Sequence, residues 1–234
     1  MTLSVRAEEL TELMDDPDAD PDRLRRTLQR FDTVNRTVGC WRRVYRSHLR
    51  PVLARLDRPA RILDIGSGGG DVLRRLVRRA RSDGFVTTGV GIDPDPRALA
   101  VARAAEEVTG LEFREAWAGD FVAAGERFDV VVSNHLLHHL RGRELEGMLR
   151  DSSALAVGIS VHSDIARGRL AYAGFSVGAA VVAPGTFLRV DGLRSIRRSF
   201  TPGELAARLP PDWRVERVNR FRLLAVHRAP YVDQ

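Results

Sequence analysis

The fold is decided by the stretch Arg61-Ile-Leu-Asp-Ile-Gly-Ser-Gly-Gly-Gly-Asp71, in which an apolar run stops abruptly at closely spaced glycines. The glycines at 66, 68 and 70 have no Cβ atom, so the backbone here can adopt positive φ and approach a ligand closely. A dinucleotide fingerprint, G-x-G-x-x-G, would need a third glycine where Asp71 stands, and no G-K-[ST] follows. The stretch therefore predicts a nucleotide-binding strand-turn-helix that does not hold a pyrophosphate.

This turn resembles the first motif of the class I S-adenosylmethionine (SAM)-dependent methyltransferases, hydrophobic-Asp-x-Gly-x-Gly-x-Gly. A glycine-rich turn alone also fits any tight strand-to-helix turn in an α/β protein, but further motifs follow in the family's order over about residues 60 to 162. The resemblance implies SAM as cofactor, bound at the turn by Asp64, Gly66, Ser67, Gly68 and Gly70.

The second motif is the apolar run 87–93, which ends in Asp93. Ligands of open α/β sheets collect at the carboxyl ends of strands, and a carboxylate can accept from both ribose hydroxyls. We expect Asp93 and Pro94 to contact the cofactor. The alternative is that Asp93 caps the next helix, with Pro94 and Pro96 setting its start.

The third and fourth motifs follow strands expected at 111–117 and 128–134. The resemblance implies that Asp120 accepts from the adenine amino group and that the N–H of Phe121 lies near the ring. The alternative for Asp120 is a surface turn. Asn134, at the end of the fourth strand, is also predicted to bind the cofactor.

The remaining pattern predicts an α/β fold with a Rossmann-like, mostly parallel sheet of seven strands. A fifth strand is expected at 154–162 and an antiparallel pair at 213–218 and 221–227, which gives the family's order 3-2-1-4-5-7-6. A capping box at Thr201-Pro-Gly-Glu204 predicts a helix through residue 209.

Residues 1–57 are predicted to form an N-terminal helical cap, with helices at 7–14, 22–34 and 41–56, and residues 58–234 a SAM-dependent methyltransferase domain. The segment 30–36 either covers the SAM pocket or packs on the sheet. Phe31, Asn35 and Tyr45 are candidate pocket residues.

Residues 163–200 are predicted to be a lid inserted after the fifth strand. Their apolar, small-residue stretch, which includes Tyr172, suggests a hydrophobic acceptor; an extra structural helix or a homodimer contact is the alternative. His162 and Asp164 stand at the strand's carboxyl edge, where acceptors bind. Asp164 and Arg167 are expected to form an ion pair that anchors the lid, or else to orient the acceptor.

Candidate catalytic residues lie in Asn134-His135-Leu-Leu-His138-His139. A phenol has a pKa near ~10, so a histidine base would assist methyl transfer at neutral pH. We expect His138 to be the base, facing the cofactor on the same side as Asn134, with His139 second because two adjacent histidines should not both face the pocket. His135 is a candidate acceptor contact. In the alternative, one histidine binds the SAM carboxylate or caps the loop.

Composition sets limits on partners and location. The net charge is +6, and every basic residue other than histidine is arginine, spread along helix faces, so no nucleic-acid partner is expected. The single cysteine excludes an internal disulfide and a multi-cysteine metal site, and methyl transfer needs no metal. With no long apolar segment and no secretory leader, a cytoplasmic protein is expected.

The sequence thus predicts methyl transfer from SAM to a hydrophobic small molecule. The preferred acceptor is a phenolic hydroxyl of an aromatic polyketide, phenolic lipid or quinol; C-methylation of such a ring is the alternative. An RNA methyltransferase is less favoured, and Ser133-Asn134-His135-Leu136 replaces the Asn/Asp-Pro-Pro-Tyr motif of adenine methylation. A NAD-dependent dehydrogenase and a noncatalytic SAM-binding protein are disfavoured.

Overall fold

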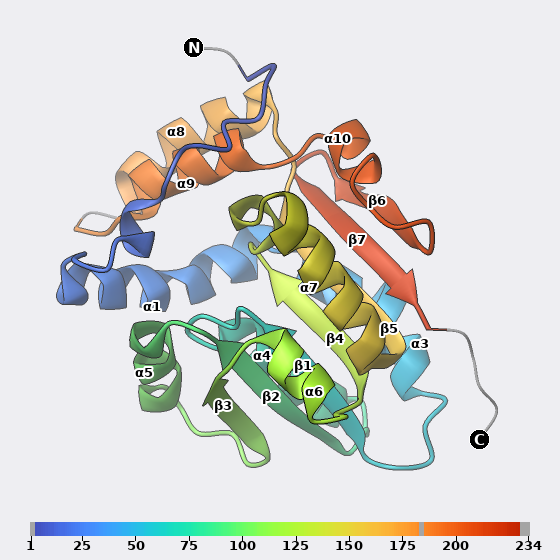
Figure 1. The fold of residues 1–234 in the computed structure, drawn as a ribbon. Coiled ribbons are helices and arrows are strands. Elements are labelled where there is room, and N and C mark those ends of the chain that lie inside the picture. Colours follow the sequence, from blue (N-terminus) through green and yellow to red (C-terminus); the bar gives the residue numbers. More distant parts are fainter. Residues whose placement is uncertain (1–2, 183–184, 230–234) are drawn as a thin grey trace.

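The computed structural model describes residues 3–182 and 185–229, and within these ranges the strands form one seven-stranded sheet of order β3-β2-β1-β4-β5-β7-β6 (Figure 1). β1 to β5 are parallel, and β7 pairs antiparallel with both β5 and β6. The strands are β1 Ala60–Ile65, β2 Thr87–Asp93, β3 Leu111–Glu115, β4 Phe128–Asn134, β5 Ala156–Ile165, β6 Trp213–Asn219 and β7 Arg222–Arg228. The predicted fold class and strand order are confirmed.

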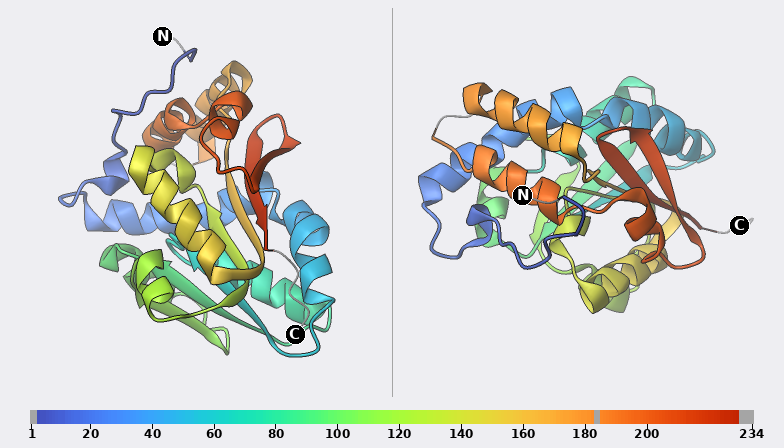
Figure 2. Two further views of the ribbon diagram at one scale, coloured as in Figure 1. Left: turned by 45° about the vertical axis from the view of Figure 1, so that its right-hand side comes forward. Right: turned by 90° about the horizontal axis from the view of Figure 1, so that it is seen from above.

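Helices cover both faces of this sheet (Figure 2). They are α1 Pro21–Val38, α2 Trp41–Val44, the π-helical η2 Tyr45–Leu49, α3 Arg50–Leu53, α4 Asp71–Ser82, α5 Pro96–Ala104, α6 Ala118–Ala123, α7 Gly142–Leu155, α8 Arg169–Val182, α9 Leu188–Arg198 and α10 Pro202–Ala206, with 3₁₀ turns η1 Leu13–Asp15 and η3 Leu137–His139. None of the helices in the described ranges combines the length and apolar character needed to cross a bilayer.

The two-residue period of the central strands assigns their side chains to opposite layers. In β4, Val130 and Val132 pack with the Trp41-to-Leu53 helices and α4, whereas Val131 packs with α6 on the other face. All of these valines are fully buried. The strands are therefore apolar on both faces, as expected for a parallel sheet covered by helices on both sides.

The N-terminal segment differs from the prediction. The helix expected at 7–14 is wrong, since only the short turn η1 forms there. The backbone N–H groups of Leu13 and Met14 donate instead to the carboxylate of Asp191 in α9, at 2.7 and 3.0 Å, and Ala7 N donates to Arg197 O. These contacts with a distant part of the chain replace the i−4 hydrogen bonds of a helix, and the segment runs along α9 (Figure 1).

α8 and α9 form a helix pair beside the carboxyl end of β4 (Figure 1). The pair packs closely, because a Cβ atom on Gly192 of α9 would lie 2.2 Å from the Phe175 ring of α8. The capping box at Thr201 and Glu204 is present and starts α10, which ends at Ala206 rather than at residue 209.

Candidate active site

The glycine turn joins β1 to α4 at the carboxyl edge of the sheet. Gly66, Gly68 and Gly70 all have positive φ, at 66°, 52° and 72°. A Cβ atom on Gly70 would lie 2.4 Å from the Phe113 ring, so the third glycine is required for both reasons. Gly68 N donates to Asp93 Oδ2 over 2.9 Å, which ties the turn to the end of β2.

Carboxylates gather around this turn. Asp64 is buried and its Oδ1 has no hydrogen-bond partner among the described residues. Burial, with the nearby charges of Asp71 and Asp93, raises the pKa of Asp64 well above its usual value. Burial also raises the pKa of Asp93. This environment favours a cationic ligand and repels a diphosphate.

Helix α1 is tied to the same region by a chain of side-chain hydrogen bonds. Asn134, at the end of β4, donates to Asn35 Oδ1 and accepts from Trp41 Nε1, each at 3.1 Å. Asn35 in turn donates to Asp71 Oδ2 at 3.1 Å. The structure therefore brings Asn35 and Asn134 to the glycine turn, and Asn35 is buried there.

The other predicted cofactor residues lie at neighbouring strand ends. Asp95, not Asp93, caps α5, since its side chain accepts from Arg97 N; Pro94 lies between these two aspartates. Asp120 is exposed and accepts from Trp117 N at 2.8 Å, which caps α6. The ring of Phe121 is buried against Phe128.

His138 lies between two carboxylates. Its Nδ1 is 2.7 Å from Asp164 Oδ1, and its backbone N–H donates to Asp164 Oδ2. Its Nε2 is 3.2 Å from Glu12 Oε1 but has no hydrogen-bond partner among the described residues. Burial alone would lower the pKa of His138, but Asp164 and Glu12 outweigh burial and raise it to about 9. His138 is thus charged at neutral pH and is not available as a base in this state.

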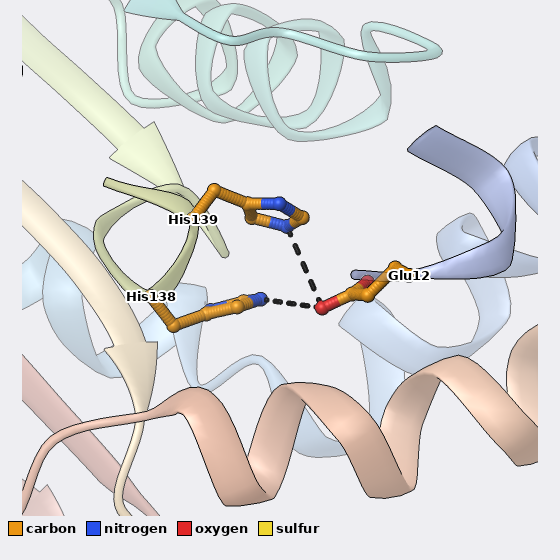
Figure 3. Close-up of side chains that lie close together, drawn as sticks. All are labelled: Glu12, His138 and His139. Atoms are coloured by element: carbon orange, nitrogen blue, oxygen red, sulfur yellow. Dashed lines mark ion pairs between the residues drawn. The ribbon is translucent and has the colours of Figure 1, made fainter. Parts of the chain in front are cut away.

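His139 turns to the same carboxylate (Figure 3). Its Nε2 lies 3.7 Å from Glu12 Oε1 and its Nδ1 lies 3.2 Å from Asp15 Oδ2. The two imidazole centroids are 4.3 Å apart. Both histidines therefore face Glu12. The 3₁₀ turn η3 also separates His138 from Asn134, whose contacts go to α1 and α2.

Two other predictions for acceptor residues are wrong. Tyr45 donates to Asp83, just beyond the far end of α4, about 18 Å from the glycine turn by helix length. His162 is buried in the core, bonded to Ser133 and stacked on Trp213, which excludes it from an open acceptor site.

The predicted Asp164–Arg167 ion pair is also wrong. Asp164 pairs with His138, whereas Arg167 contacts Glu204 at 2.5 Å and donates to Leu3 O and Ser199 O. Arg167 thus joins the N-terminal segment to the region after α9, as an anchor with different partners.

Three further candidates lie at the edge of the site or outside it. His135 has a positive φ of 59°, and its Nε2 lies 2.7 Å from Arg222 Nη2. Tyr172 lies in α8 and is half-buried. The side chain of Phe31 lies outside the described residues.

Sequence reasoning missed Glu12 and Asp15, which complete the histidine cluster. Glu12 also accepts from Ser195 Oγ at 2.7 Å, and Arg198 Nη1 lies 3.7 Å from it. No local signal marks these acids, because the contacts that place them come from α9, more than 170 residues later in the chain.

Comparison with known proteins agrees with this geometry. Residues 62–156 match the family model described as a methyltransferase domain. A ubiquinone biosynthesis O-methyltransferase of Cereibacter sphaeroides is 43% identical over 82 residues, which is 34% of this chain and 31% of that protein. The protein of the same name from a Methylobacterium is 40% identical over 81 residues, 34% of this chain and 30% of that protein. The chain spans about a third of the length of these curated relatives.

Solved structures share the fold over most of the chain. The plantazolicin methyltransferase BpumL, in complex with a triazolic desmethylPZN analog and SAH, has a TM-score of 0.63 at 15% identity and covers 92% of both chains. A second solved structure carries the description "Conversion of a Disulfide Bond into a Thioacetal Group during Echinomycin Biosynthesis". It has a TM-score of 0.56 at 19% identity and covers 88% of this chain and 94% of that one.

Proposed function

We propose that this chain, which belongs to the class I SAM-dependent methyltransferases, transfers the methyl group of SAM to a hydroxyl group of a hydrophobic small molecule. The observation that carries the proposal is the positive-φ glycine turn with the carboxylates of Asp64, Asp71 and Asp93 around it. SAM supplies an electrophilic methyl group on a positively charged sulfonium.

The turn fits SAM better than a dinucleotide. SAM carries a sulfonium and an ammonium and no phosphate, so buried carboxylates with raised pKa gain a counter-charge when it binds. A nicotinamide dinucleotide would bring a diphosphate into the same negative region. We assign SAM to the turn (Asp64, Gly66, Ser67, Gly68 and Gly70), to the strand ends (Asp93, Pro94 and Asn134) and to Asp120 and Phe121.

The acceptor hydroxyl has to lose its proton, and we assign this step to the cluster of Glu12, His138 and His139. His138 keeps its proton between two carboxylates, so it contributes positive charge and position. His139 is the more open histidine, with a side chain 26% exposed, against 1% for His138. We therefore assign the base role to His139 rather than to His138.

The acceptor is proposed to be a phenolic hydroxyl of a quinol, phenolic lipid or aromatic polyketide. Two observations support it: the apolar composition of α8, proposed as part of a lid, and the partial likeness to proteins named as ubiquinone biosynthesis O-methyltransferases. Methylation at a ring carbon is the second candidate, since the same base could remove a ring proton.

The first experiment is calorimetry of the purified chain with SAM, SAH and NADH. Micromolar binding of SAM and SAH, with no binding of NADH, is expected. Asp93→Ala should weaken SAM binding at least tenfold, whereas Glu112→Ala, an exposed change on β3, should leave it unchanged. Binding of NADH without SAM would overturn the proposal.

Acceptor chemistry is then tested with methyl-labelled SAM and a panel of phenols and quinols. Labelled methyl ethers support O-methylation, label on ring carbon supports the second candidate, and turnover only with RNA would contradict both.

A further inference from the structure

We propose that Glu12, His138 and His139 form a binding site for a divalent transition-metal ion of the zinc type. Glu12 Oε1, His138 Nε2 and His139 Nε2 converge from the N-terminal segment and from η3 (Figure 3). One carboxylate oxygen and two imidazole nitrogens are the donor set of a catalytic zinc site that keeps a position open. The sequence had predicted no metal, because methyl transfer does not require one and a single cysteine excludes a multi-cysteine site.

The distances suit such an ion. Glu12 Oε1 lies 3.2 Å from His138 Nε2 and 3.7 Å from His139 Nε2. Zinc–ligand bonds of about 2.1 Å in a tetrahedron place neighbouring ligand atoms about 3.4 Å apart. An ion could therefore enter with small side-chain shifts.

Both histidines are oriented as metal ligands usually are. A ligating histidine commonly donates its second ring N–H to a carboxylate, which fixes the tautomer and points the other nitrogen at the metal. Here His138 Nδ1 faces Asp164 at 2.7 Å and His139 Nδ1 faces Asp15 at 3.2 Å. The Nε2 atom of each histidine then points toward Glu12. Both rings therefore have the orientation of a metal ligand, and both face the same carboxylate.

A buried polar atom marks the place of the ion. His138 is 1% exposed, yet its Nε2 has no hydrogen-bond partner among the described residues. Without an ion, this nitrogen faces Glu12 Oε1 at 3.2 Å and pairs with it when His138 is protonated. A metal ion would coordinate that nitrogen directly.

The local charge allows a divalent ion. Glu12, Asp15 and Asp164 supply three negative charges, and Arg198, at 3.7 Å from Glu12 and 3.5 Å from Asp15, supplies one positive charge. With neutral histidines the cluster has a net charge of about −2, which a divalent cation balances. The competing occupant is a proton on His138.

A second possible trio, His135, His138 and Asp164, is less suitable. The Nε2 of His135 already lies 2.7 Å from the Arg222 guanidinium, and Asp164 is engaged by both the ring and the backbone of His138. The ion is therefore assigned to the Glu12 side.

The site also bears on the chemistry and, in this respect, rests on the proposed function. A metal with an open position lowers the pKa of a bound hydroxyl group. An acceptor hydroxyl bound there would lose its proton to water, and His139 would act as a ligand instead of a base.

The test uses full-length, untagged protein stripped with EDTA and titrated with Co²⁺ and Zn²⁺. We expect about one ion per chain, visible d–d absorption of four- or five-coordinate Co²⁺, and displacement of Co²⁺ by Zn²⁺. Glu12→Gln and His139→Ala should each weaken binding at least tenfold. Asp15→Asn, which removes only the carboxylate behind His139, should weaken it about tenfold.

The matched control is His48→Gln, which changes a histidine paired with Glu216 on another part of the molecule and should leave the metal affinity unchanged. Absence of stoichiometric Co²⁺ binding, or affinity that both ligand variants leave intact, would overturn the metal site. His138 is not substituted, because its loss would leave buried Asp164 unpaired and endanger folding.

Calorimetry with SAM on the same samples separates the two proposals. SAM binding and methyl transfer without metal binding would reject the metal site and keep the proposed function. Metal binding without SAM binding would keep the site and reject the function.

Discussion

Asn134, the last residue of β4, donates its side-chain amide to Oδ1 of Asn35 in helix α1, 3.1 Å away. The side-chain amide of Asn35 in turn donates to Oδ2 of Asp71, the first residue of α4. One buried amide thus holds the N-terminal helix against the glycine turn. The consequence is that the cap and the proposed cofactor site should respond together to mutation.

Asn35→Ala tests this coupling. The change leaves the amide of Asn134 without its acceptor and removes a donor from Asp71, so we expect a loss of about 1–3 kcal/mol in the free energy of unfolding. SAM affinity should fall several-fold, because the turn loses a contact that positions it. Urea denaturation and calorimetry measure the two effects. Arg25→Ala, on the exposed side of α1, should change neither, and an Asn35→Ala protein with wild-type values for both would contradict the coupling.

Gly70→Ala should be strongly destabilising. A positive φ of 72° costs alanine about 1–2 kcal/mol, and overlap with the Phe113 ring at 2.4 Å adds about 1–3 kcal/mol. Gly125→Ala is the control, since its φ is 70° and no atom lies within 4 Å of the added Cβ. Thermal unfolding of both variants separates the backbone cost from the clash. Equal losses would mean that the Phe113 ring moves aside freely.

The sequence predicted the sheet and the cofactor side because both are encoded locally. Apolar runs that end at Asp64 to Gly66, at Asp93 and at Asn134 specify strand ends, and parallel strand ends meet at one edge of the sheet. Strand boundaries therefore came out within a few residues, and the side chains of Asn35 and Asn134 lie at the glycine turn.

The acceptor side was not predictable in the same way. The segment around Glu12 has the composition of a helix, but the backbone N–H groups of Leu13 and Met14 donate to Asp191 in α9, and only the short turn η1 forms there. The positive φ of His135 and the short η3 turn then point His138 and His139 to that segment. These are contacts between distant parts of the chain, and no local pattern contains them.

Tyr45→Phe should flatten the alkaline loss of stability. Burial and Asp83 raise the pKa of Tyr45 to about 12, so between pH ~10 and 12 the unfolded chain loses this proton while the folded chain keeps it. The free energy of unfolding then falls with rising pH by up to about 1.4 kcal/mol per pH unit from this residue. The variant lacks this pH dependence. Below pH ~10 the stabilising contribution of Tyr45 is fully present in the wild type, so neither curve slopes there because of this residue.

Denaturant unfolding of wild type and Tyr45→Phe from pH 8 to 11.5 measures the difference. The chain contains no lysine and three tyrosines, so few other groups titrate in this range, and subtracting the two curves removes those groups. Parallel curves would mean that the phenol is not held in its protonated form by the fold. Asp83 keeps Arg50 and Arg79 as partners, so the variant should fold.

Asp64→Asn should stabilise the unliganded protein and weaken SAM binding. The pKa of Asp64 is raised in the folded state by burial, Asp71 and Asp93, so its stabilising contribution is present only below the unfolded pKa of ~3.9 and is lost as pH rises through the folded value. At pH 7 the raised pKa therefore makes this carboxyl a net cost to folding that asparagine removes, and we expect an increase of about 1 kcal/mol or more in the free energy of unfolding. SAM affinity should fall at least tenfold, because the cationic ligand loses a counter-charge, as in other sites where function opposes stability.

Asp129→Asn is the contrasting control. Asp129 is equally buried but accepts from the guanidinium of Arg58 and from Arg61 N, so removing its charge should destabilise the fold. Thermal unfolding at pH 7 and calorimetry with SAM decide the case. Destabilisation by Asp64→Asn comparable to that of Asp129→Asn would show that Asp64 serves the fold rather than the ligand.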